Sequence, residues 1–192
     1  MVSQGFIVAA IRYSRGYIQE IEKLVEELLN AVLFLKKKFD NLHKDQFALM
    51  GLSTGGHLAL LTGLRYTNLV DKIIAYYTPC DLMDIWKSES IFARFSVTAT
   101  IKRLPNKSKD IYEKYSPINY VTPASPKILL AHGMKDSVVP YVSSVKMFKK
   151  LRQKGCTAKL LLHPKGDHGF EFVLKDRKTL EILEKTIDFL TN

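Results

Sequence analysis

Two kinds of hydrophobic pattern alternate along the chain. Short, continuous apolar runs predict strands that are buried on both faces, and they lie at residues 6–11, 47–50, 73–77, 128–131 and 159–162. Between them, apolar residues recur every three or four positions, which predicts amphipathic helices. The helical stripes are Ile18, Ile21, Val25, Leu28, Val32, Leu35 and Phe39; His57 to Leu61; Val142, Val145, Phe148 and Leu151; and Leu180, Leu183, Ile187 and Leu190. This alternation predicts an α/β fold, a mostly parallel sheet with helices on both faces.

Residues 84–126 do not follow the alternation. This stretch is rich in aromatic residues and prolines, namely Trp86, Phe92, Phe95, Tyr112, Tyr115, Tyr120, Pro105, Pro117, Pro123 and Pro126. Such a long excursion between two strands is typical of a lid or pocket wall. A helical insertion that packs its aromatics into the core fits the pattern equally well.

Size and composition indicate one ordinary globular domain over residues 1–192. Hydrophobic residues make up 46% of the 192 positions, and no apolar run approaches the roughly 20 residues that span a bilayer. The net charge of +10 invites a nucleic-acid hypothesis, but the lysines are spread along the chain. The tight run Lys36-Lys37-Lys38 closes a predicted helix, where cations are favoured. We therefore expect neither a nucleic-acid nor a membrane partner.

The two cysteines lack metal-ligand spacing. Cys80 and Cys156 could in principle form a disulfide, but free buried thiols in a reducing cytoplasm are the better interpretation. Since the start of the chain lacks a basic leader and a small-residue cleavage site, it predicts a strand and not a signal peptide. We expect a cytoplasmic protein.

The strongest chemical signal is the segment Gly51-Leu52-Ser53-Thr54-Gly55-Gly56. An apolar run enters it and a helical pattern leaves it. A serine on such a sharp turn needs small neighbours because the backbone is crowded and strained. The helix that follows offers backbone N–H groups to a developing oxyanion, the first being that of Thr54. The pattern predicts Ser53 as a nucleophile.

A serine nucleophile needs a base, and the base needs an orienting acid. Asp136 and His168 each follow a predicted strand, so both lie where the loops of an open α/β sheet build their sites. Their order along the chain, serine, acid, histidine, is the one this type of fold uses. We predict Asp136 as the acid and His168 as the base, with no cofactor and no metal.

Other residues compete for these roles. Asp81, after the third predicted strand, is the best alternative acid, and Asp167 is expected to point away from His168. The remaining histidines favour other interpretations: structural for His163, packing for His57, a hydrogen-bonded core position for His132, and a polar loop for His43.

These motifs resemble the α/β-hydrolase superfamily, particularly its esterase/lipase and prolyl-oligopeptidase-like branches, over nearly the whole chain. The matching segments are residues 4–13, 47–57, 116–121, 132–140 and 166–170. Ser53, Asp136 and His168 fall on the family's triad positions. The resemblance implies hydrolysis of a small-molecule carboxylic ester through an acyl-enzyme, without a cofactor.

The resemblance also implies a departure, because family members carry several strands before the one at residues 6–11. The strand just upstream ends in a His-Gly-Gly-type loop that supplies a second oxyanion donor. We therefore expect a truncated reading frame with little activity alone, and an incomplete sheet that allows edge-to-edge pairing into a homo-oligomer. A stop codon upstream of Met1, with no His-Gly-Gly-coding segment in frame, would contradict a misplaced start. A prolyl-oligopeptidase-like peptidase and an inactive remnant stay open as alternatives.

Overall fold

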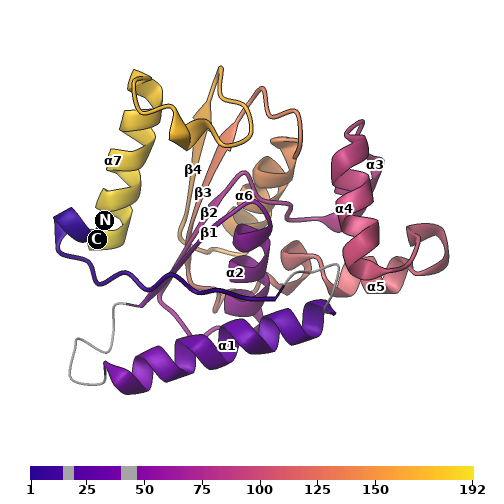
Figure 1. Ribbon diagram of the computed structural model, residues 1–192, viewed down its shortest axis with the longest axis horizontal. Coiled ribbons are helices and arrows are strands. Elements are labelled where there is room, and N and C mark those ends of the chain that lie inside the picture. Colours follow the sequence, from indigo (N-terminus) through magenta and orange to yellow (C-terminus); the bar gives the residue numbers. More distant parts are fainter. Residues whose placement is uncertain (15–19, 40–46) are drawn as a thin grey trace.

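The computed structural model describes residues 1–14, 20–39 and 47–192. Within them, four parallel strands form one sheet in the order β1-β2-β3-β4 (Figure 1). The strands are β1 (Ala48–Leu52), β2 (Lys72–Tyr76), β3 (Lys127–Gly133) and β4 (Ala158–His163). Their order along the chain equals their order in the sheet, so all carboxyl ends meet at one edge. The α/β fold with a parallel sheet is confirmed, as are four of the five predicted strands.

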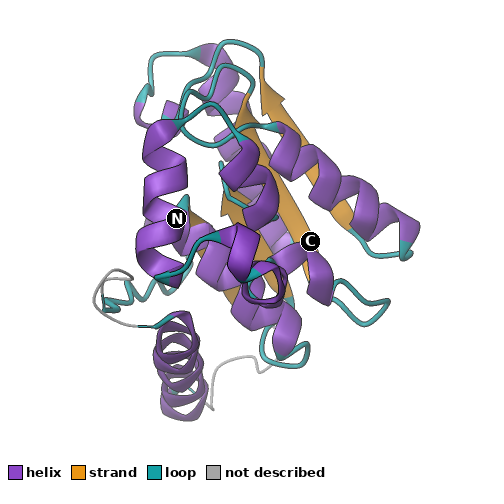
Figure 2. Ribbon diagram, turned by 90° about the vertical axis from the view of Figure 1, so that its right-hand side faces the viewer, coloured by secondary structure: helices purple, strands orange, loops and turns teal. Residues whose placement is uncertain are grey.

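Helices cover both faces of this sheet. Alternate residues of β2 and β3 point to opposite sides: Ile73 and Ile128 belong to one core cluster, Ile74 and Leu129 to the other. The first cluster is covered by α2 (Thr54–Arg65) and α6 (Val142–Gln153), with α1 (Ile21–Lys38) packed outside α2. The second is covered by α7 (Arg177–Thr191), at the left of the sheet in Figure 1. Figure 2, seen from the side of α2 and α6, has the helices of that face in front of the strands.

The predicted helix over residues 18–39 is confirmed in its described part. Its buried side is formed by Ile21, Leu24, Val25, Leu28 and Val32. The run Lys36-Lys37-Lys38 does form the last turn, where cations stabilise the negative end of the helix dipole. Ile18 lies outside the described residues.

The strand predicted at residues 6–11 is wrong. This segment belongs to no strand of the sheet, and the side chains of Ile7 and Val8 are exposed. An apolar, β-branched run forms a strand only where a neighbour completes its backbone hydrogen bonds. Among the described strands, β1 pairs with β2 alone, so nothing in the sheet fixes residues 6–11.

The buried faces of the last two helices are rotated from the predicted ones. In α6 the buried residues are Ser143, Ser144, Met147 and Leu151, and in α7 they are Thr179, Ile182, Thr186 and Phe189. Val142 and Leu180, which we expected inside, are exposed. Small hydroxyl residues can face the sheet because their oxygens have hydrogen-bond partners there: Thr186 donates to the Ile182 carbonyl, Thr179 donates to the Phe170 carbonyl, and Ser143 accepts from Cys80 N–H.

Residues 84–126 combine features of both predicted alternatives. The segment contains α4 (Ile91–Ile101) and α5 (Lys109–Lys114), and α3 (Leu82–Lys87) precedes them. Tyr112 is fully buried, and Trp86 packs against the first core cluster. Both fit the predicted helical insertion that packs its aromatics into the core. Phe92 and Phe95, however, are 68% and 71% exposed on α4. A lid role for the segment stays a prediction.

Two further predictions concern the thiols and the membrane. Cys80 and Cys156 are both free and buried, as expected. In the described part of the chain, none of the helices has the length and apolar character needed to cross a bilayer.

Candidate functional site

Ser53 occupies a sharp turn between β1 and α2. Its backbone has φ 51° and ψ −119°, an uncommon conformation for a residue with a side chain. The turn is held from both sides, because Ser53 N–H donates to the Tyr76 carbonyl (2.9 Å) and the Ser53 carbonyl accepts from His57 N–H (3.0 Å). The sequence predicted this strained strand–turn–helix segment, and the structure has it at the same residues.

Close approach of the backbone explains the glycines around Ser53. A Cβ on Gly51 would lie 2.3 Å from the Gly55 carbonyl carbon, and a Cβ on Gly56 would lie 2.1 Å from Thr78 Oγ1. A Cβ on Gly55, by contrast, would meet only the Tyr13 hydroxyl, at 3.4 Å. Gly51 and Gly56 therefore let the first turn of α2 pack against the end of the sheet.

We expect Gly51→Ala to lower the free energy of unfolding by about 3 kcal/mol, because a methyl group would be forced against backbone that cannot move aside freely. Gly55→Ala is the matched control, since it adds a methyl group to the same turn in ordinary contact space and improves helix propensity. Urea unfolding of both variants measures the difference. Equal stability of the two would contradict the close packing at Gly51.

Asp136 is held in the loop after β3 by a full set of donors. Its Oδ1 accepts the N–H groups of Val138 and Val139, each at 2.8 Å. Its Oδ2 lies 3.1 Å from His132 Nε2 and 2.9 Å from His168 Nδ1. Burial alone would raise the pKa of Asp136, but the hydrogen bonds from the two histidines and the backbone outweigh it and lower that pKa. The carboxylate is thus charged at neutral pH.

His132 supports Asp136, a role that the sequence did not reveal. It is fully buried, as a core histidine should be, and its Nε2 lies 2.9 Å from the Val139 carbonyl. A carbonyl only accepts, so Nε2 carries the proton, and Nδ1 accepts from the Ser144 hydroxyl at 2.7 Å. Its Nε2–H is therefore shared between Val139 and Asp136. No local pattern marks this contact, because the loop must first fold back over β3.

His168 joins Asp136 to Ser53. Its Nδ1 lies 2.9 Å and 3.2 Å from the two Asp136 oxygens, and its Nε2 lies 3.0 Å from Ser53 Oγ. The Asp136 side chain is fully buried, whereas that of His168 is 22% exposed. The structure thus brings together the three residues that the sequence singled out, with the imidazole partly open to solvent.

The loops that carry Asp136 and His168 are packed against each other. A Cβ on Gly133 would lie 2.2 Å from the Gly166 carbonyl oxygen, and Lys135 N–H donates to that same oxygen at 2.9 Å. Contrary to the prediction, Asp167 does not point away from His168: its Oδ1 accepts from the backbone N–H of His168 at 2.7 Å and from that of Ser137 at 2.8 Å. These contacts fix the spacing between acid and imidazole.

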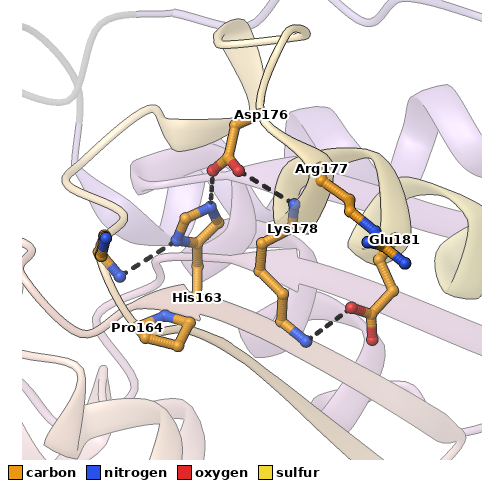
Figure 3. A pocket seen from close by; sticks show the side chains of 7 residues that line it. His163, Pro164, Asp176, Arg177, Lys178 and Glu181 are labelled. Atoms are coloured by element: carbon orange, nitrogen blue, oxygen red, sulfur yellow. Dashed lines mark hydrogen bonds and ion pairs between the residues drawn. The ribbon is translucent and has the colours of Figure 1, made fainter.

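The competing residues have other partners. Asp81 caps α3 by accepting from the N–H groups of Met83 and Asp84. His163 is buried and bonded to Asp176, the residue that caps α7. This pair lies in a pocket that Pro164, Arg177 and Glu181 also line (Figure 3). The catalytic candidates Ser53, Asp136 and His168 do not line this pocket. His43 lies outside the described residues.

His57 is buried one turn after Ser53, where its Nδ1 donates to the Pro79 carbonyl at 2.8 Å. It packs, as expected, and burial lowers its pKa to about 4. Because an unfolded histidine titrates near 6.5, the unfolded chain binds more protons than the folded one between these values. Stability therefore falls as the pH drops from 6.5 toward 4.

We expect His57 alone to reduce the free energy of unfolding by about 2 kcal/mol between pH 7 and pH 5. Urea unfolding of the wild type and of His57→Gln at both pH values checks this. The pH-dependent loss should be about 2 kcal/mol smaller in the variant. An identical loss in both proteins would contradict a neutral, buried His57.

Thr54 begins α2 directly after Ser53, so its N–H belongs to the positive end of the helix dipole. With Ser53 Oγ, His168 and Asp136, the arrangement can remove a proton from an alcohol and stabilise a nearby anion.

Comparison with known proteins agrees with the fold. A family model described as BD-FAE matches residues 1–151. Esterase LipC of Mycobacterium tuberculosis is 24% identical over 190 residues, covering 90% of this chain and 47% of LipC. The chain spans about half the length of the curated relatives it matches first.

Two solved structures share the fold. A truncated carbohydrate esterase from gut microbiota aligns with a TM-score of 0.80 at 20% identity, covering 95% of this chain and 74% of that protein. The acylaminoacyl peptidase of Pyrococcus horikoshii aligns with a TM-score of 0.78 at 18% identity, covering 88% of this chain and 27% of the peptidase. The family model covers well over half of the sequence, and the chain therefore belongs to the BD-FAE family, with the α/β-hydrolase fold of the esterase and peptidase-like branches.

Proposed function

We propose that this protein is a serine hydrolase that cleaves carboxylic esters through an acyl-enzyme. The observation that carries the proposal is the continuous chain of hydrogen bonds from Asp136 through His168 to Ser53, with 2.9 Å at Nδ1 and 3.0 Å at Nε2. Nucleophile, base and orienting acid within such distances are the requirement for activating a serine. The family relatives named as esterases support the same reaction.

In this mechanism, Ser53 Oγ attacks the ester carbonyl while His168 Nε2 accepts its proton. The Asp136 carboxylate keeps the Nδ1–H tautomer and stabilises the imidazolium that forms. The Thr54 N–H stabilises the oxyanion, a contribution that typically amounts to about 100- to 1000-fold in turnover. His168 then protonates the leaving alcohol, and a water molecule releases the acid by the same steps in reverse.

The proposed substrate is a small ester with an apolar acyl group. We assign the wall of the acyl site to residues 84–126. The reason is that Ala93 of α4 packs in one buried cluster with Val139, which lies three residues past Asp136 in the loop after β3. Phe92 and Phe95 of the same helix are exposed, and we assign to them the lid role predicted for this segment. We also propose a cytoplasmic location, because both thiols are free and a reducing compartment keeps thiols in that state.

A panel of p-nitrophenyl esters, with a proline-containing p-nitroanilide beside it, tests the proposal. We expect that any hydrolysis of short acyl esters by the wild type, however slow, depends on Ser53, so that Ser53→Ala shows none above background. Preferential cleavage of the anilide would favour the alternative hypothesis, a peptidase, whose fold is shared by the acylaminoacyl peptidase. No Ser53-dependent turnover in folded protein would overturn the proposal in favour of an inactive remnant.

A further inference from the structure

Tyr77 has an unusual backbone at the end of β2. It is a non-glycine residue with φ 38°, and only 3% of its surface is exposed. Residues with side chains rarely take this conformation, which costs about 1–3 kcal/mol and persists only where the surroundings enforce it. Here the Tyr77 N–H donates to the Ala131 carbonyl at 2.7 Å, which keeps the residue tied to β3 while its side chain turns toward the carboxyl edge of the sheet.

The ring of Tyr77 lies against the imidazole of His168. The two ring centroids are 4.4 Å apart with an interplanar angle of 56°. Both nitrogens of that imidazole are already bonded, to Asp136 and to Ser53. Hydrogen bonds along the ring edge restrain the nitrogens in the ring plane, but they leave the ring free to tilt. Contact with the Tyr77 ring restricts that tilt.

The hydroxyl of Tyr77 holds the same loop at a second point. It donates to Oε1 of Glu171, three residues after His168. The other carboxylate oxygen, Oε2, is buried without a hydrogen-bond partner in the part of the chain that the structure describes. A buried carboxylate with so few donors depends strongly on each one. The Tyr77 hydroxyl is therefore the donor on which the Glu171 carboxylate depends, and it adds a tether to the turn after His168, which the buried Phe170 also anchors.

We propose that Tyr77 is a positioning residue: its ring and its hydroxyl together hold the His168 imidazole in line with Ser53 Oγ. This inference rests on the proposed function, in which His168 is the base. Displacing a reacting group by about 1 Å can cost up to about 100-fold in rate without weakening substrate binding. Loss of the tether should therefore lower kcat and leave KM nearly unchanged.

The test compares Tyr77→Phe with Tyr76→Phe. Tyr76 is the adjacent residue, is also buried, and its hydroxyl is also bonded, but to Thr186 Oγ1 of α7 at 2.6 Å. Each variant removes one buried tyrosine hydroxyl at the end of β2, so both should lose similar stability. Turnover of p-nitrophenyl acetate, divided by the concentration of titratable serine, separates active-site geometry from partial unfolding.

We expect kcat per titrated site to fall about 10-fold or more in Tyr77→Phe, with KM within about twofold, and to stay at the wild-type value in Tyr76→Phe. Glu171→Ala should cause the same loss, and the double variant Tyr77→Phe/Glu171→Ala no further loss, because both remove one tether. Equal kcat in Tyr77→Phe and Tyr76→Phe would overturn the inference.

A second measurement does not depend on turnover. In NMR spectra of the wild type and of Tyr76→Phe, the His168 side chain should give one sharp set of signals, including the Nδ1–H bonded to Asp136. In Tyr77→Phe these signals should broaden through exchange on the μs–ms timescale. Unchanged signals would contradict positioning by Tyr77. If the wild type hydrolyses no ester, the proposed function fails, while the NMR comparison still decides whether Tyr77 positions His168.

Discussion

His168→Ala is expected to reduce kcat/KM for an ester by at least about 10⁴-fold, close to the loss caused by Ser53→Ala. In the proposed mechanism the imidazole accepts the Ser53 proton across the 3.0 Å contact, and no other histidine side chain of the described chain is bonded to Ser53 Oγ. Serine and base act as a unit, so removing either disables the same step. Steady-state kinetics with p-nitrophenyl acetate measures the effect.

The double variant Ser53→Ala/His168→Ala is the control for this prediction. It should be no less active than Ser53→Ala alone, because the second substitution removes a group that has already lost its partner. Circular dichroism must show that all three variants are folded. More than a tenth of the wild-type activity in His168→Ala would mean that another group serves as base.

Asp136→Asn should lower kcat by about 10⁴-fold through the tautomer of His168. The Oδ1 position faces the N–H groups of Val138 and Val139, so the asparagine must keep its carbonyl oxygen there. Its NH₂ group then replaces Oδ2, which faces His168 Nδ1. An NH₂ group can only donate, so Nδ1 must become the acceptor and Nε2 must carry the proton. The imidazole can then no longer accept the Ser53 proton.

Asp81→Asn provides the matched control. Asp81 was the alternative acid, but its side chain caps α3, and asparagine is an equally good N-cap residue. We expect its kcat to equal that of the wild type within about twofold, a difference of less than 1 kcal/mol in the barrier. A large loss in Asp81→Asn together with a small loss in Asp136→Asn would reverse the assignment of the acid.

The parts of the site that sequence could predict are those with local signals. The turn at Ser53 combines an apolar run, close glycines and a helical pattern, all within a few residues. Asp136 and His168 could be placed because each follows a predicted strand, and parallel strands end at one edge of the sheet. The four strands of the described sheet are likewise continuous apolar runs, so each could be predicted without knowing which strand pairs with it.

What the sequence could not predict depends on contacts between distant segments. Residues 6–11 have a strand-like pattern, but a strand exists only where another strand pairs with it. His132 contacts Asp136 only because the loop after β3 folds back, and Tyr77 contacts His168, which lies 91 positions further along the chain. The positive φ of Tyr77 has no composition signal, since such conformations are normally marked by glycine or asparagine.

The most direct test of the account is covalent labelling of the folded protein with a fluorophosphonate, followed by peptide mapping. The reagent modifies a serine only when a neighbouring base makes its oxygen nucleophilic. We predict one adduct per chain, located on Ser53, and no adduct in His168→Ala. Absence of labelling in the folded wild type, or an adduct on another serine, would contradict a serine activated by Asp136 and His168.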